Sequence, residues 1–267
     1  MRSWVGIAWL FLYSVSCFAD LSASQTRLPR EDWRHAAERY YFNLRREGVL
    51  PSPQSQLQDE SAQRAAVPLA KLVFSRLPEW GSAVQITQAF NWIRDIRFLF
   101  LPEMAKFPRR ISWLYPDDGC FARAQIAVEK LGNNDYSRPR KLFIFGNLTV
   151  KTPNAPGGTV SWWYHVVPVI GFQGRPLIFD PAIQTAEPIE LKDWILSMTS
   201  NPETVSVSLC HPETYAPASS CARGDSTAQD SAIRDEQRYL REEWERMQTL
   251  GRNPQQVLGD LPPWRQR

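Results

Sequence analysis

The feature that most constrains this chain is a cysteine placed where a helix begins, with a histidine and an aspartate downstream. Cys120 follows an Asp-Gly pair and opens a run of helical periodicity. His165 lies in a strand-like run, and Asp180 ends another. A helix N-terminus and a neighbouring imidazolium lower the pKa of a thiol from about 8.5 to roughly 3.5–7.5, and the thiolate is the reactive form. The order of the three residues therefore predicts an enzyme with a cysteine nucleophile.

Each of the three residues also has a structural interpretation that the sequence leaves open. A single cysteine is often a small buried apolar side chain, and a strand histidine often has only a structural role. Asp180 precedes Pro181 and can simply end a strand and start a turn. The catalytic interpretation is favoured because the three residues occur together and in order.

Composition narrows the class of protein. The 267 residues are 43% hydrophobic and include 11 Trp, which is enough for one sizeable core. The net charge is only +3, and the basic residues are interspersed with acidic ones. We therefore expect no nucleic-acid partner, because such proteins gather basic residues in patches.

The N-terminus has the pattern of a secretory signal over residues 1–19. Arg2 supplies a positive charge, an apolar run follows, and Ala19 ends a small-residue cleavage pattern. The apolar run is shorter than the ~20 residues of a membrane span. Cys17 is a candidate lipoprotein cysteine, but the residues before it lack the usual leucine. We expect a secreted or periplasmic protein with no stable membrane insertion.

The remaining cysteines predict one disulfide and one free thiol. Removal of residues 1–19 leaves Cys120, Cys210 and Cys221, an odd number for an exported protein. The last two bracket a loop rich in Pro, Ser and Ala, where a local disulfide fits. A zinc site would need more ligands than the nearby His211 provides. We expect neither a metal nor an organic cofactor.

Hydrophobic periodicity predicts an α+β chain with helical ends. We expect four segments: the signal (1–19), a helical N-terminal extension with a Pro/Gln/Ser-rich linker (20–80), a catalytic domain (81–224) and a C-terminal amphipathic helix with a tail (225–267). The predicted helices cover 31–46, 68–77, 82–100, 121–131, 191–198 and 231–250, and the predicted strands cover 142–145, 160–172 and 177–179.

Four motifs then resemble one family, the secreted bacterial protein glutaminases, within the papain- and transglutaminase-like superfamily. They are ISWLYPDDGCFARA at 111–124, FGNL at 145–148, VSWWYHV at 160–166 and IFDPA at 178–182. Any one of these motifs alone is weak, but four in the same order are specific.

The resemblance implies a papain- or transglutaminase-like fold and hydrolysis of the side-chain amide of protein-bound glutamine. Carried over residue by residue, it makes Cys120 the nucleophile, His165 the base and acid, and Asp180 the orienting carboxylate. Trp162, Trp163 and Tyr164 are candidate substrate-binding residues, because the two indoles can wall a cleft and exclude water. The resemblance also implies an N-terminal pro-region that blocks the site until it is cut.

Several alternatives share these residues. A transglutaminase passes the acyl group to an amine instead of water, and a cysteine peptidase attacks a backbone amide. A glutamine deamidase effector directed at host proteins and a non-catalytic binding module are further alternatives. We expect a monomer whose partners are proteins or peptides with exposed glutamine, with an inhibitory pro-region or an immunity protein as a further partner.

Overall fold

A computed structural model of the chain describes residues 26–48, 60–224 and 226–266. The predicted signal (1–19) and most of the predicted linker lie outside these residues. Among the described helices, none is both long and apolar enough to cross a bilayer.

Six strands of the described chain form one antiparallel sheet in the order β1-β6-β2-β3-β4-β5. Neighbouring residues of β2 alternate between two apolar clusters, because successive side chains of a strand point to opposite faces. Leu142 and Ile144 join one cluster, while Phe143 and Phe145 join the other. The bounds are β1 Val67–Pro68, β2 Arg140–Lys151, β3 Thr159–Phe172, β4 Arg175–Ile178, β5 Ile189–Glu190 and β6 Ser206–Cys210.

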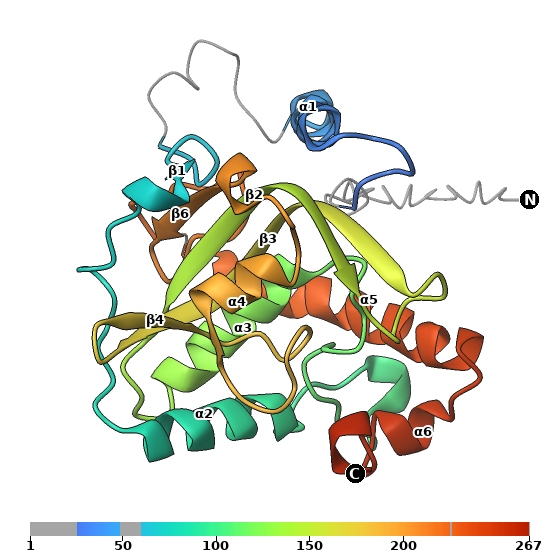
Figure 1. The fold of residues 1–267 in the computed structure, drawn as a ribbon. Helices are drawn as coiled ribbons and strands as arrows, with labels where there is room; N and C mark the ends of the chain where they lie inside the picture. The colour runs from blue at the N-terminus through green and yellow to red at the C-terminus, as the bar shows by residue number, and fades with distance from the viewer. Residues whose placement is uncertain (1–25, 49–59, 225, 267) are drawn as a thin grey trace, which may run out of the picture.

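Helices cover both faces of the sheet, so the predicted α+β class is confirmed. Helices α3 and α5 pack on the Phe143 face, and α4 packs on the Leu142 face. Helix α1 lies over β2 and β3 at one end of the sheet, whereas α2 lies at the opposite end (Figure 1). The bounds are α1 Trp33–Arg46, α2 Ala83–Asp95, α3 Cys120–Gly132, α4 Leu191–Leu196, α5 Ala228–Thr249 and α6 Pro254–Val257, with 3-10 turns at Leu69–Lys71, Pro102–Met104, Pro202–Thr204 and Pro263–Arg265.

The helix predicted over 68–77 is wrong. Val67 pairs with Val207 of β6, and only Leu69–Lys71 forms a 3-10 turn. The apolar residues beyond the turn pack one by one on the α4 side of the sheet, with Phe74 among them. The spacing of these apolar residues indicated a helix, but their contacts with the sheet hold residues 72–77 in a non-helical conformation.

The helix predicted over 82–100 begins as expected and ends early. Ser82 caps it, accepting a hydrogen bond from the backbone N–H of Gln85. The helix ends at Asp95, because the chain then turns extended and Leu99 pairs with Arg109 in a backbone bridge. This pairing ends the helix.

The predicted C-terminal helix is present as α5 and packs against α3, but two of its charged residues face inward. Glu243 accepts a hydrogen bond from the backbone N–H of Leu114 (2.8 Å) and pairs with the buried Arg109 (2.6 Å). Glu236 accepts from the backbone N–H of Ser112 (2.6 Å). Burial raises the pKa of Glu236 to about 7 and also raises that of Glu243. The two carboxylates thus fix the segment that leads to Cys120.

Replacing Arg109 with methionine is expected to lower the free energy of unfolding by about 3–5 kcal/mol, because Glu243 then keeps a buried charge without its partner. Urea denaturation measures this loss. Arg241→Ala is the matched control: it removes an exposed pair between the same helix and Glu103, and it should leave the free energy of unfolding almost unchanged. Equal losses in the two variants would contradict a charged Glu243.

Candidate active site

Cys120 is the first residue of α3, and its position depends on the glycine before it. Gly119 has φ of 85°, in the left-handed region that favours glycine. A Cβ atom there would also lie 2.6 Å from the ring of Tyr239 on α5. Cys120 is nearly buried, and among the described cysteines it is the one outside a disulfide. The first N–H groups of a helix have no partner inside it, so they are available to an anion.

His165 and Asp180 form a buried pair beside this helix start. His165 lies on β3, and its Nε2 is 2.9 Å from Oδ2 of Asp180. Asp180 lies two residues beyond β4, where the backbone N–H of Phe179 still donates to the carbonyl of Pro168. Both side chains are only 2% exposed, so the pair is shielded from water.

The Cys120 thiol lies close to the imidazole. Cys120 raises the pKa of His165. Nδ1 of His165 has no hydrogen-bond partner of regular geometry among the described residues. Because Nε2 is held by Asp180, Nδ1 is the nitrogen left for the thiol. The structure thus brings together all three residues of the predicted constellation.

The electrostatics favour a charged pair. Burial alone would lower the pKa of His165, but the charge and hydrogen bond of Asp180, together with Cys120, raise it to about 9. Burial has the opposite effect on Asp180 and would raise its pKa. The charge of His165 and hydrogen bonds from His165 and Trp194 nevertheless hold the pKa of Asp180 below its usual value. An imidazolium is therefore present at neutral pH beside the Cys120 thiol.

Of the three predicted substrate-binding residues, Trp162 lies against the histidine. Its ring stacks on that of His165 with centroids 4.8 Å apart and an angle of 10°. Its Nε1 donates to the carbonyls of Pro116 (2.9 Å) and Asp117 (3.2 Å). Trp162 thereby connects β3, which contains His165, to the loop that precedes Cys120.

Trp163 and Tyr164 are fully buried in the aromatic cluster around Cys120. The indole nitrogen of Trp163 and the hydroxyl of Tyr164 are buried and have no hydrogen-bond partner among the described residues. Unpaired buried donors are unfavourable unless a ligand completes them. Their role as substrate-binding residues stays a prediction.

Helix α1 covers this cluster. Its buried side chains Ala36, Ala37, Tyr40 and Leu44 belong to the same apolar cluster as Cys120. The Tyr40 ring lies 5.3 Å from that of Trp163. Burial, followed by nearby acidic groups that include Cys120, raises the pKa of Tyr40 well above its usual value. The periodicity of the sequence predicted this helix, and the resemblance implied a blocking pro-region, but neither identified the residues that the helix contacts.

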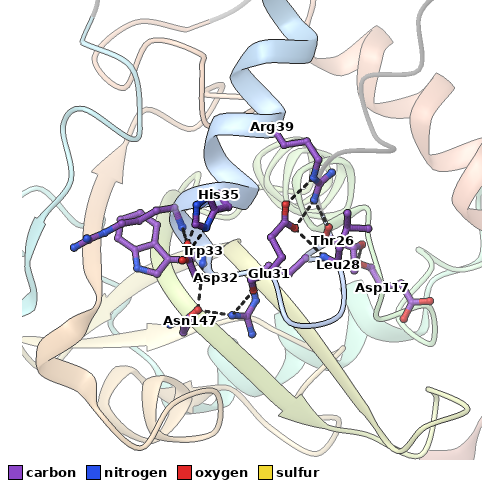
Figure 2. A network of polar contacts seen from close by, with 11 residues as sticks. Thr26, Leu28, Glu31, Asp32, Trp33, His35, Arg39, Asp117 and Asn147 are labelled. Carbon is purple, nitrogen blue, oxygen red and sulfur yellow. Dashed lines mark hydrogen bonds and ion pairs between the residues drawn. The ribbon is translucent and has the colours of Figure 1, made fainter.

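The strap before α1, residues 26–32, is also fastened beside the site (Figure 2). Thr26 donates to the carbonyl of Asp117 (2.5 Å) and forms an antiparallel bridge with Trp162. Asn147, on β2, accepts hydrogen bonds from Arg27 and from the backbone N–H of Trp33. The strap is stiffened by Arg39, which pairs with Glu31 (2.8 Å) and donates to the Thr26 carbonyl (2.9 Å). A hollow of about 770 Å³ lies along the strap, and none of the three candidate catalytic residues lines it.

The predicted disulfide between Cys210 and Cys221 is present. The loop that it closes binds residues 60–62 through backbone hydrogen bonds. The Cys221 N–H donates to the Glu60 carbonyl, and the Ala62 N–H donates to that of Ser219. In the described part of the chain, no three His, Cys, Asp or Glu side chains gather closely enough to hold a metal ion.

Comparison with known proteins agrees with the motifs. Residues 86–198 match the family model described as "Glutaminase". This segment of the chain belongs to the glutaminase family. It contains Cys120, His165 and Asp180, and the resemblance carried by the four motifs is confirmed. The family supports a hydrolase that acts on glutamine amides. No curated protein matches the chain in sequence.

Three solved structures are similar to this chain. A mutant pro-protein-glutaminase is 20% identical, with 70% of this chain and 68% of that chain covered and a TM-score of 0.47. A protein-glutaminase crystal structure is 21% identical (72% and 94% covered, TM-score 0.43). The protein-glutaminase of Chryseobacterium proteolyticum is 20% identical (69% and 92% covered, TM-score 0.45). The α+β assignment follows from the sheet and helices of this chain.

Two features of the site were not predicted from the sequence. Trp194 donates to Asp180, and Asn147 holds the strap. Asn147 lies in one of the four motifs, so that motif could have drawn attention to it. Trp194 lies in a short predicted helix, and nothing in its sequence setting distinguishes it from a core residue.

Proposed function

We propose that this protein is an exported protein glutaminase that converts protein-bound glutamine to glutamate and ammonia through Cys120, His165 and Asp180. The observation that carries the proposal is the buried His165–Asp180 pair beside a free cysteine at a helix start, inside a glutaminase-family segment. An N-terminal secretory pattern supports export.

In the proposed reaction, the Cys120 thiolate attacks the side-chain carbonyl carbon of glutamine, and the oxygen becomes an oxyanion. The free N–H groups at the start of α3 stabilise this oxyanion, an interaction worth about 3–4 kcal/mol in comparable sites. The carbon–nitrogen bond then breaks, and ammonia leaves with a proton from His165, so a thioester remains. His165 next takes a proton from water, which attacks the thioester and releases glutamate and the Cys120 thiolate.

Asp180 keeps the imidazole in one orientation and stabilises its charged form, because its carboxylate accepts from Nε2 and leaves Nδ1 toward the thiol. Trp162 covers one face of the ring and keeps water from it. The buried donors of Trp163 and Tyr164 are suited to hydrogen-bond the amide oxygen of a bound glutamine side chain.

We also propose that the strap and α1 form an inhibitory pro-region. Their contacts with Asp117, Asn147 and the cluster around Cys120 support this role. Residues 60–80 bind the catalytic body separately, since β1 pairs with β6 and the Trp80 N–H donates to Gly171. A cut that releases the pro-region therefore belongs within residues 50–59.

A blocked glutaminyl peptide tests the proposed reaction. We expect ammonia release and a peptide 1 Da heavier, because oxygen replaces the NH of the amide. The same assay with a primary amine, beside a matched asparaginyl peptide, separates the alternatives by mass spectrometry. An amine adduct would show a transglutaminase, a cut backbone would show a peptidase, and no change after the pro-region is cut would reject the glutaminase.

A further inference from the structure

The carboxylate of Asp180 has a second partner besides the histidine. Nε1 of Trp194, on α4, donates to Oδ2 of Asp180 at 2.9 Å. The same oxygen lies 2.9 Å from Nε2 of His165. One carboxylate oxygen is therefore held from two directions by two N–H donors.

The indole is itself held rigidly. Trp194 is fully buried in the apolar cluster between α4 and the sheet, together with Ile178 and Val167. Its ring centroid lies 5.8 Å from that of His165, at an angle of 30°. A buried indole N–H needs an acceptor, and here the acceptor is the candidate catalytic carboxylate.

We propose that Trp194 is a positioning residue for the reaction: its indole N–H fixes Oδ2 of Asp180, so that Asp180 can orient His165 toward Cys120. The proposal rests on the proposed function for its link to catalysis. The hydrogen bond itself can be tested without any turnover.

The charges around the pair give the expected direction. Asp180 faces His165 and, from α3, the charge of Arg123, while His165 faces Asp180 and Cys120. Burial opposes the ionised carboxylate, and the indole N–H is one of the few groups that offset it. Without this donor, Oδ2 is no longer fixed and the carboxylate turns away from Nε2 of His165, so the pKa of Asp180 rises and that of His165 falls.

The test is Trp194→Phe in the full chain, with the imidazole titration followed by NMR. The chain has three histidines, which makes the assignment of His165 simple. We expect the pKa of His165 to fall by about one unit, because the hydrogen bond of its imidazolium to Asp180 weakens when the carboxylate is no longer fixed. Trp264→Phe is the matched control: it removes an indole N–H that donates to Asp95 (2.8 Å), away from the site, and it should leave His165 unchanged.

Turnover provides a second readout. We expect Trp194→Phe to lower kcat about 10- to 100-fold with little change in KM, and to move the alkaline limb of kcat/KM to lower pH. A purely structural tryptophan would lower the amount of folded protein without moving this limb. An unchanged His165 pKa with an unmoved limb would overturn the proposal.

The titration also separates this proposal from the proposed function. A shifted His165 pKa in a protein that never releases ammonia would keep the positioning role and reject the glutaminase. If Trp194→Phe does not fold, Asp180→Asn in the full chain decides instead. The indole N–H resonance of Trp194, identified by its contact with the His165 ring, should then move upfield, and an unmoved resonance would overturn the proposal.

Discussion

Cutting the chain within residues 50–59 and diluting the released piece is expected to raise ammonia release about 100-fold. Helix α1 buries Tyr40 and Leu44 against the cluster that contains Cys120. Burial of two such side chains contributes about 3–6 kcal/mol, part of which is offset by the loss of chain entropy. A net preference of about 2.7 kcal/mol for the covered state leaves about 1% of the uncut protein open.

Two substitutions on α1 test the same idea without a protease. Tyr40→Ala should raise the activity of the uncut chain, because it removes the ring that packs on Trp163. Phe42→Ala is the matched control on the same helix, since Phe42 is 59% exposed, and it should change nothing. Equal activity in cut and uncut protein would reject an inhibitory pro-region.

The parts of the fold that the sequence predicted well are those fixed by local chemistry. Helix α3 begins at Cys120 because Gly119 supplies a left-handed residue just before it. Strands β2 and β3 contain β-branched and aromatic residues that suit a sheet buried on both faces. The order of Cys120, His165 and Asp180 then indicated a site, and the structure brings the three together.

The parts that were missed depend on distant contacts. Strand β6 is only five residues long, and it exists because β2 offers it a partner. Glu236 and Glu243 looked like solvent-facing charges on an amphipathic helix, but both are buried, and backbone N–H groups more than a hundred residues away donate hydrogen bonds to them. Periodicity records which residues share a helix face and not what lies opposite that face.

The covering of the site by α1 shows the same limit. The spacing of apolar residues predicted the helix, but any apolar stripe of that length has the same periodicity. Its place is set by Thr26 and Asn147, whose partners lie in separate parts of the chain. The resemblance to a family suggested a pro-region, whereas the contacts identify the residues that would hold it.

Replacing Cys120 with alanine is expected to lower glutaminase activity by at least about 10⁴-fold, because no other described free thiol can form the thioester. Cys120→Ser should be nearly as inactive. A serine hydroxyl is a far weaker acid than a thiol, so it stays protonated beside His165, whose pKa is about 9. In both variants, the free energy of unfolding should stay within about 1 kcal/mol of that of the unchanged protein. Ammonia release from the cut protein measures the activity, and calorimetry checks that the fold is kept.

The pH profile of the same protein identifies which group ends the active range. Burial lowers and Asp180 raises the pKa of His165, with a net rise to about 9, so the imidazolium that stabilises the thiolate is present below this pH and lost above it. The alkaline limb of kcat/KM should therefore lie near pH 9, and Asp180→Asn should move it to lower pH by removing the negative charge. A limb that stays near pH 9 in Asp180→Asn would mean that His165 does not supply it.

Residual activity in Cys120→Ala above that of a protein-free control would assign the attack on the amide to another group.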